Sequence, residues 1–412
     1  MVKIIMRIKS FSIVLMLALI CLIPCRSADA AAPPEIIGVA GVLIDSESGQ
    51  VLYVKEPHKH MYPASTTKVL TAIIAIESCN LSDIVTVPAE ACGIEGSSIG
   101  LHENEQISMR DLVYALMLNS GNDAAVAIAI HIGGSVENFA DMMNSRASAL
   151  GAIDSHFENP NGLPDENHYT SAYDLSLIAK YAMKNQIFRE IVSTQISEMH
   201  RTYPDAQTQL ANSNRLFSRY PGTIGVKTGY TDIAGQCLIA ASEKDGRELI
   251  SVVLCSEGTG IYDDSIALME YGHNEFNKIS VIQVGSFVTN LQVNRGSPDY
   301  VGVTAGQSII YSIPVDNSQT IEQRVFVYED LTAPLSSGQK LGELAFFNEG
   351  AEFGRVDLIA QNDVSRNRLS YWRQASYVLI LLVAIRLIGF VRRRSRRRYF
   401  DRRKRERLEY LR

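Results

Sequence analysis

Three short segments of this chain bring together hydroxyl, amine and amide side chains that can act jointly on an acyl bond. They are Ser65-Thr66-Thr67-Lys68, Ser120-Gly121-Asn122 and Lys227-Thr228-Gly229, in that order. A serine hydroxyl becomes a strong nucleophile only when a neighbouring base takes its proton. Residues three apart on a helix share one face, so Lys68 can reach Ser65. The first segment therefore predicts a serine nucleophile with a lysine base, a pairing used to cleave acyl bonds through a covalent intermediate.

The other segments supply the groups that such a pair needs. A lysine can act as a base only if its pKa falls towards neutrality, and burial and nearby positive charge both lower it. The apolar run 69–76 after Lys68 predicts a buried helix, and Lys227 is a candidate for the nearby charge. Ser120 is a candidate to relay a proton to the leaving group, and Asn122 is a candidate to hold a substrate amide.

The third segment closes a predicted strand. Lys227 and Thr228 are suited to binding a carboxylate, and Gly229 lets the backbone lie close to a ligand. Each segment alone is common, since S-x-x-K occurs in surface helices and S-G-N in ordinary turns between helices. The specific signal is their combination, in this order, in a chain that carries an export signal.

Two other patterns offer competing sites. Gly96-Ser97-Ser98-Ile99-Gly100 matches a G-x-S-x-G nucleophile elbow, which needs a strand before it and a helix directly after it. A polar loop follows instead, so we do not expect a nucleophile at Ser98. His156 and His168 lie near acidic residues and resemble parts of a catalytic dyad, but isolated histidines in polar loops are usually surface residues.

Both ends of the chain carry membrane signals. A basic start, an apolar run and an A-x-A cleavage site ending at Ala30 predict that residues 1–30 are a signal peptide. The apolar stretch 375–391 is predicted to be a transmembrane anchor, with an amphipathic helix on the membrane surface as the alternative. The tail 392–412 contains twelve Lys/Arg and three Asp/Glu residues. Because basic flanks stay in the cytoplasm, the chain should cross the membrane once with its body outside.

Charge and cysteine content limit the possible partners. The whole chain carries −6, residues 1–30 carry +3 and the tail carries +9, which leaves −18 on the body between them. An acidic body argues against nucleic acid as a partner. The mature chain keeps four cysteines, which can form disulfides outside the cytoplasm or remain buried free thiols: Cys79, Cys92, Cys237 and Cys255. No Cys/His spacing suggests a zinc site, and no metal or other cofactor is expected.

The body between the membrane signals suits two domains. Residues 36–279 show strand patterns near both ends and helical patterns between them. This arrangement predicts an α+β fold with one antiparallel sheet built from both ends of the domain and a helical block. Residues 280–365 contain only short alternating runs, which predict a small β-sandwich.

Taken together, these segments resemble the D-alanyl-D-alanine carboxypeptidases, the low-molecular-mass penicillin-binding serine peptidases of bacterial cell walls. The likeness extends beyond the three motifs to the layout of export signal, catalytic domain, β-rich domain and anchor. It also includes the segments Pro63-Ala64-Ser65-Thr66-Thr67-Lys68, Glu95-Gly96-Ser97-Ser98, Asn119-Ser120-Gly121-Asn122-Asp123, Asn159-Pro160-Asn161-Gly162-Leu163 and Gly225-Val226-Lys227-Thr228-Gly229-Tyr230-Thr231. The resemblance implies a β-lactamase/DD-peptidase-like fold for residues 36–279.

The same resemblance implies an activity. Ser65 would attack the D-Ala–D-Ala bond of a peptidoglycan pentapeptide, and β-lactam antibiotics would acylate the same serine. The backbone N–H groups of Ser65 and Tyr230 would form the oxyanion hole. The enzyme would sit in the bacterial cell membrane with its catalytic domain outside the cytoplasm. Some members of the family place an arginine where this chain has Ser213, so contacts to the substrate carboxylate do not carry over at that position.

Two alternatives remain open from the sequence. Class A β-lactamases carry a glutamate that activates the deacylating water, and their E-x-x-L-N segment is absent between the second and third motifs. A non-catalytic module that senses penicillin or binds the wall is the other alternative, and the intact Ser65 and Lys68 argue against it.

Overall fold

The computed structural model describes residues 32–409 except 204, 317–319, 329 and 368, so the predicted signal peptide lies outside the described residues. The chain divides into two compact units. The first contains the described residues up to Ile279 together with 311–316. The second contains residues 280–310 and the described residues from 320 onward.

A five-stranded antiparallel sheet is the centre of the first unit, with strand order β2-β1-β9-β8-β7. Its strands are β1 (Ala40–Asp45), β2 (Val51–Lys55), β7 (Thr223–Thr231), β8 (Gly235–Lys244) and β9 (Arg247–Ser256). Strands from the start and from the end of the unit therefore share one sheet, which confirms the prediction of an α+β fold.

The helical block lies between these strands in the sequence. Its helices are η1 (Ala64–Thr67), α2 (Lys68–Ser78), η2 (Ala89–Ala91), α3 (Met109–Leu118), α4 (Asn122–Gly133), α5 (Val136–Ala149), α6 (Ala172–Met183), α7 (Gln186–Ser193) and α8 (Leu216–Arg219). Two small hairpin-like sheets pair β3 (Ile84–Thr86) with β4 (Gln106–Ser108) and β5 (Ile196–Glu198) with β6 (Gln209–Ala211). Helix α9 (Gly260–Asn274), which the sequence patterns did not predict, follows β9.

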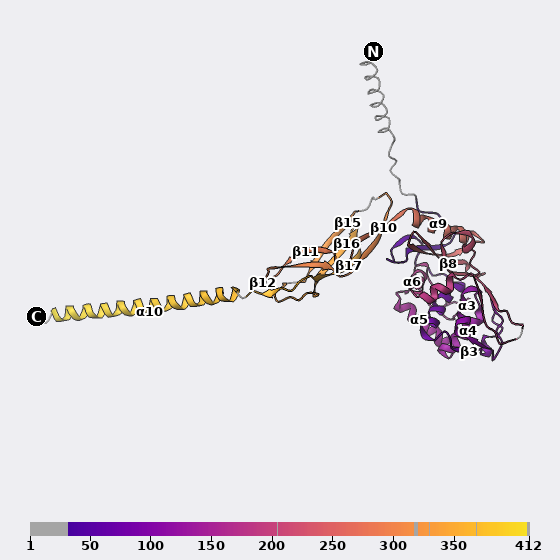
Figure 1. Cartoon of the computed structure of the whole chain (residues 1–412), viewed down its shortest axis with the longest axis horizontal. Helices are drawn as coiled ribbons and strands as arrows, with labels where there is room; N and C mark the ends of the chain where they lie inside the picture. The colour runs from indigo at the N-terminus through magenta and orange to yellow at the C-terminus, as the bar shows by residue number, and fades with distance from the viewer. Residues whose placement is uncertain (1–31, 204, 317–319, 329, 368, 410–412) are drawn as a thin grey trace, which may run out of the picture. The chain divides into compact units, whose positions relative to one another are not determined.

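Both faces of the central sheet are covered. Figure 1 shows β8 between α9 on one side and helices α3 to α6 on the other. Successive strand residues point to opposite faces, and Val42 packs with the helical block while Leu43 packs with the core that contains α9 residues. Strands covered on both faces are buried at consecutive positions, which explains the nearly continuous runs of buried residues in β1, β8 and β9.

Helix α2 is surrounded by other elements. Every residue from Lys68 to Ile76 is buried, as the run of apolar residues predicted. The helix therefore carries its first residue, a lysine, into the interior. Helix α3 is capped at its N-terminus by Ser108, whose side chain accepts a hydrogen bond from the Asp111 N–H.

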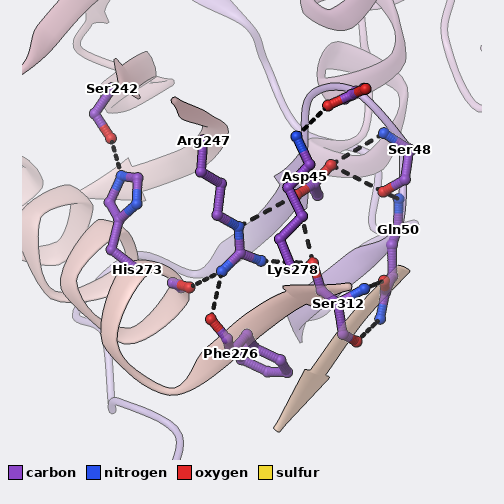
Figure 2. Close-up of polar contacts among 11 residues, drawn as sticks. Asp45, Ser48, Gln50, Ser242, Arg247, His273, Phe276, Lys278 and Ser312 are labelled. Carbon is purple, nitrogen blue, oxygen red and sulfur yellow. Dashed lines mark hydrogen bonds and ion pairs between the residues drawn. The ribbon is translucent and has the colours of Figure 1, made fainter. Parts of the chain in front are cut away.

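A segment far along the chain completes the first unit. Ser312 exchanges two hydrogen bonds with the Gln50 side chain, at 2.8 Å from Gln50 Nε2 to Ser312 O and 2.7 Å from Ser312 N to Gln50 Oε1. The buried Arg247 donates to Ser312 Oγ at 2.7 Å and to Asp45 Oδ2 at 3.3 Å (Figure 2). It also donates to the Phe276 carbonyl oxygen, which fixes the chain where it leaves α9.

All four mature cysteines are free thiols in the structure. Burial raises the pKa of the Cys237 thiol to about 12, so this side chain acts as a small apolar group. Of the two sequence alternatives, free thiols rather than disulfides describe this structure, but only Cys237 is buried and the other three are partly exposed.

The second unit is built from strands. A five-stranded sheet has the order β11-β13-β17-β16-β15, and β12 pairs with β18. The strands from β10 onward are β10 (Phe276–Ile282), β11 (Phe287–Gln292), β12 (Gly296–Ser297), β13 (Tyr300–Ala305), β14 (Ile309–Pro314), β15 (Ile321–Val327), β16 (Lys340–Asn348), β17 (Ala351–Ala360) and β18 (Ser365–Arg366). Strands β10 and β14, which pair with each other, run from one unit into the other. The β-rich prediction for this region is confirmed.

Helix α10 (Leu369–Glu409) ends the described chain. Its stretch Trp372–Arg405 is long and apolar enough, by length and composition, to cross a membrane. This stretch contains the whole predicted anchor 375–391.

Candidate active site

Ser65 and Lys68 are in direct contact. Ser65 lies in the 3-10 turn η1, and Lys68 is the first residue of the α-helix that continues from it. Lys68 Nζ is 2.8 Å from Ser65 Oγ. Ser65 is half-buried, whereas Lys68 is completely buried with 0% of its surface exposed. The local spacing therefore brings the two groups together as the sequence predicted.

Two further oxygen atoms surround the Lys68 amine. Asn122 Oδ1 lies 2.7 Å and the Asn161 backbone oxygen 2.6 Å from Nζ. The Asn122 amide nitrogen donates to the Glu95 carbonyl at 2.6 Å, which assigns the amide oxygen to the side facing Lys68. Lys68 thus meets three oxygen atoms and no carboxylate within ion-pair distance in the described part of the chain.

These surroundings favour the neutral form of the lysine. Burial lowers the pKa of Lys68 well below its ordinary value, and the nearby positive charge of Lys227 lowers it further. The carboxylate of Asp123 opposes this shift but does not cancel it. Lys227 is itself 1% exposed, and burial lowers its pKa to about 7.

Ser120 lies at the break between α3 and α4. Its backbone has a φ of 62°, a strained value for a residue with a side chain, and the residue is buried. Among the described residues no hydrogen bond joins Ser120 to Lys68, although the adjacent Asn122 does contact it. The second motif is therefore next to the serine–lysine pair, with the amide rather than the hydroxyl in contact.

Strand β7 brings the third motif alongside η1. A Cβ atom added at Gly229 would lie 2.9 Å from the Ser65 backbone nitrogen, so only glycine lets the strand approach this closely. Lys227 donates to the Thr228 carbonyl at 2.9 Å, and the Thr228 hydroxyl is 3.0 Å from the Ser213 hydroxyl. The exposed Tyr230 donates through its hydroxyl to Asp232.

The Asn161 carbonyl contacts the Lys68 amine, but Asn161 was not among the predicted site residues. Asn161 belongs to the segment Asn159-Pro160-Asn161-Gly162-Leu163, which the family resemblance singled out without assigning it a role. Gly162 has a φ of 86°, and a Cβ there would lie 1.8 Å from the Ala64 carbonyl oxygen. This segment is pressed against the turn that carries Ser65. The sequence signal was the glycine, but a backbone carbonyl has no side-chain signature of its own.

The residues of the two competing sequence patterns lie outside the contact between Ser65 and Lys68. Ser98 donates to the buried Asp123 carboxylate at 2.6 Å, and no strand or helix flanks it as an elbow would require. His156 is partly exposed, with 43% of its side-chain surface accessible to solvent, in agreement with the prediction of a surface residue. That prediction is wrong for His168, which is 1% exposed because the loop 158–168 folds back over η1 and hydrogen-bonds through the ring.

Comparisons with known proteins agree with this geometry. Residues 27–258 match the family model described as D-alanyl-D-alanine carboxypeptidase, and residues 276–366 match the C-terminal domain of penicillin-binding protein 5. D-alanyl-D-alanine carboxypeptidase DacF of Bacillus subtilis is 30% identical over 334 residues, which cover 79% of this chain and 86% of that protein. DacD of Escherichia coli is 29% identical over 82% of this chain and 89% of its own.

A solved structure is also similar over most of the chain. Penicillin-binding protein 5 from Haemophilus influenzae matches with a TM-score of 0.71 and 29% identity. The match covers 82% of this chain and 100% of that one. The likeness therefore includes both the unit with the serine–lysine pair and the β-rich unit that follows it.

Proposed function

Since the chain belongs to the D-alanyl-D-alanine carboxypeptidase family and is a serine-type carboxypeptidase of the cell wall, we propose that Ser65 is its nucleophile and Lys68 its base. The substrate would be the pentapeptide stem of peptidoglycan, from which the enzyme removes the terminal D-alanine. β-Lactam antibiotics would acylate the same serine. Penicillin-binding proteins of this family act on peptidoglycan, which supports this choice of substrate.

The observation that carries the proposal is the set of atoms around Lys68 Nζ. A neutral amine has two N–H groups and one lone pair. The Asn122 and Asn161 oxygens can only accept, so they take the two N–H groups and leave the lone pair for the Ser65 hydroxyl. After Lys68 accepts the proton, the ammonium donates to the same three oxygens. No partner is lost during the transfer, which suits a general base.

The chemical sequence follows from these positions. Ser65 Oγ attacks the carbonyl carbon of the D-Ala–D-Ala bond while its proton passes to Lys68. The oxyanion would be held by the backbone N–H groups of Ser65 and Tyr230, and the glycine at 229 lets the strand approach Ser65 closely enough. Ser120 would donate its hydroxyl proton to the leaving amine and take up the proton held by Lys68, D-alanine departs, and water then hydrolyses the acyl-enzyme.

Substrate binding is assigned to strand β7 and the second motif. We expect the terminal carboxylate at Lys227 and Thr228, with the Ser213 hydroxyl 3.0 Å from Thr228 where some relatives have an arginine. Gly229 would pass beside the peptide backbone. Asn122 would contact the substrate amide, although in this structure both ends of its side-chain amide are occupied, by Lys68 and Glu95.

Labelling with penicillin tests the assignment of the nucleophile. The purified protein should gain one penicillin, and peptide mapping should place the adduct on Ser65. Ser65→Ala should show no adduct and should release no D-alanine from a D-Ala–D-Ala pentapeptide. An adduct that persists on Ser65→Ala would rule out this serine. Rapid hydrolysis of penicillin, without a lasting adduct, would favour a β-lactamase instead.

We extend the proposal to the membrane. Helix α10 would cross the bacterial cell membrane once, with the tail 392–412 in the cytoplasm and the chain that precedes the helix outside. A fragment of residues 31–373 should then be soluble and active, since it contains all three motifs and lacks the apolar stretch. If protease added outside intact cells removed the basic tail, the proposed topology would be wrong.

A further inference from the structure

His168 is a buried titratable residue that the proposed chemistry does not use. Its ring is 1% exposed and lies edge-on to Phe157, with centroids 5.5 Å apart. A buried polar ring without partners is costly, so its hydrogen bonds should reveal what it holds. Both ring nitrogens have partners: Thr67, which lies between Ser65 and Lys68 in the sequence, and Glu158, which lies much further along the chain.

The two contacts assign the tautomer. The Glu158 backbone N–H can only donate, and it lies 3.1 Å from Nδ1, so Nδ1 carries no proton. Burial lowers the pKa of His168 to about 4, so the ring is neutral at physiological pH and its proton is on Nε2. Nε2 therefore donates to the Thr67 hydroxyl, 2.9 Å away. The ring is a directional link between two pieces of backbone.

Those two pieces meet at the lysine. Thr67 immediately precedes Lys68, and Glu158 begins the short segment whose Asn161 carbonyl lies 2.6 Å from Lys68 Nζ. Thr71, one turn further along α2, donates to the Pro160 carbonyl at 2.6 Å. Segment 158–161 is thus attached to the start of α2 at its two ends and at one point between them.

We propose that His168 is a positioning residue for Lys68: by tying Thr67 to segment 158–161, it keeps the Asn161 carbonyl on the amine and so keeps the amine directed at Ser65. This inference rests on the proposed role of Lys68 as the base. His168 touches neither Ser65 nor the Lys68 amine and acts through the backbone it holds. If the segment moves away, one N–H loses its acceptor, and the amine can turn its lone pair away from the serine hydroxyl.

If the Lys68 amine is no longer directed at Ser65, acylation by penicillin should slow, but the binding of penicillin should not weaken. His168→Asn keeps an acceptor near the Nδ1 position but loses the donor to Thr67. Thr67→Val keeps the volume of the threonine but removes the acceptor of the same hydrogen bond. Each should lower the acylation rate constant at saturating penicillin by about 10- to 100-fold and leave the penicillin dissociation constant unchanged. The double variant should be no slower than the slower single variant, because both changes remove one shared contact.

The controls separate this inference from a purely structural role and from the proposed function. His131→Asn, a change at an exposed histidine of α4, should acylate like the wild type, and all rates are measured well below the melting temperature of each variant. Normal acylation by both His168→Asn and Thr67→Val, with only lower melting temperatures, would overturn the proposal. So would a normal rate for Thr67→Val alone, or a rate constant unchanged against a weaker dissociation constant. Failure of the wild type to be acylated at Ser65 would instead refute the proposed function itself.

Discussion

Two groups of buried cations in the first unit have opposite surroundings. The amines of Lys68 and Lys227 meet hydroxyl, amide and carbonyl oxygens, and in the described chain neither forms an ion pair. Arg247 and Arg201 are also buried, but each lies against a carboxylate. Arg247 pairs with Asp45, and Arg201 with Glu105, whose side chains are nearly or fully excluded from solvent.

The two surroundings have different electrostatic consequences. Without a counter-charge, burial lowers the pKa of Lys68 well below its ordinary value and that of Lys227 to about 7. The ion pairs of the second group act on pKa values in a different way. Burial lowers the pKa of Arg247, and the negative charge of Asp45 acts against this shift. Burial acts to raise the pKa of Glu105, but hydrogen bonds from Arg201 and the His102 N–H hold it below its ordinary value.

Burying a charged side chain is unfavourable in both groups, but the two groups have different roles. Removing a charge from water is unfavourable unless a partner compensates it. An uncompensated lysine can release its proton and become a base, whereas an arginine keeps its charge and must be paired. The paired arginines therefore hold distant segments together, as Arg247 does between β1 and residue 312 (Figure 2). Four substitutions test this distinction.

Lys68→Arg should have the largest effect. Arginine keeps the positive charge but cannot give up its proton in a protein, so it cannot act as the base. We expect acylation by penicillin to fall by about 10²–10⁴-fold, measured as the rate of adduct formation. Circular dichroism and thermal melting serve as controls for the fold. A folded variant that acylates at nearly the wild-type rate would show that Lys68 is not the base.

Asn122→Asp would give Lys68 the counter-charge that Arg247 already has. A carboxylate 2.7 Å from Nζ stabilises the ammonium form, so the pKa of Lys68 should rise. Lys68 acts as a base only above its pKa, and the fall in acylation on the acid side should therefore move to higher pH. The measurement is the acylation rate from pH 5 to pH 10, with recovery expected at the alkaline end. An unchanged pH profile would contradict the view that the missing carboxylate controls the lysine.

Arg247→Met should affect stability and not chemistry. Removing one partner of a buried ion pair leaves Asp45 uncompensated and typically costs about 3–5 kcal/mol. We expect the free energy of unfolding, from denaturant titration of the full ectodomain, to fall by about this amount. Arg110→Met, at an exposed surface pair, is the matched control and should change it by less than about 1 kcal/mol. If the acylation rate constant of the folded Arg247→Met variant fell as far as that of Lys68→Arg, the distinction between the two groups would be wrong.

Ser312→Ala should have the smallest effect. The variant loses the hydrogen bond from Arg247 and the longer one, 3.4 Å, that the Ser312 hydroxyl donates to Asp45. It keeps the ion pair between Arg247 and Asp45 and both backbone bonds to Gln50. The expected loss is about 1–2 kcal/mol of unfolding free energy, with unchanged acylation. Ser280→Ala, at an exposed serine of β10, should be neutral. A loss as large as that of Arg247→Met would mean that the hydroxyl, rather than the ion pair, holds the segment.

Much of the local structure could be predicted from the sequence, because it depends on neighbours along the chain. The contact of Ser65 with Lys68 follows from a spacing of three residues. The burial of α2 follows from its continuous apolar run, and the start of α3 from the Ser108 cap. Helix α9 was missed because three of its six buried positions, Asp264, Ser265 and Gly272, are polar residues or glycine and interrupt the apolar face.

The chain by itself therefore determined which residues could do chemistry and which segments had to be buried. Only the tertiary structure decided what surrounds them. The Asn161 carbonyl on Lys68, the burial of His168 and the docking of Ser312 at Arg247 all join residues far apart in sequence. Such contacts leave no periodic pattern, and a backbone carbonyl is the same atom in every residue. Whether a buried cation is a base or a fixed charge is decided by its nearest oxygen atoms, which only the folded chain brings together.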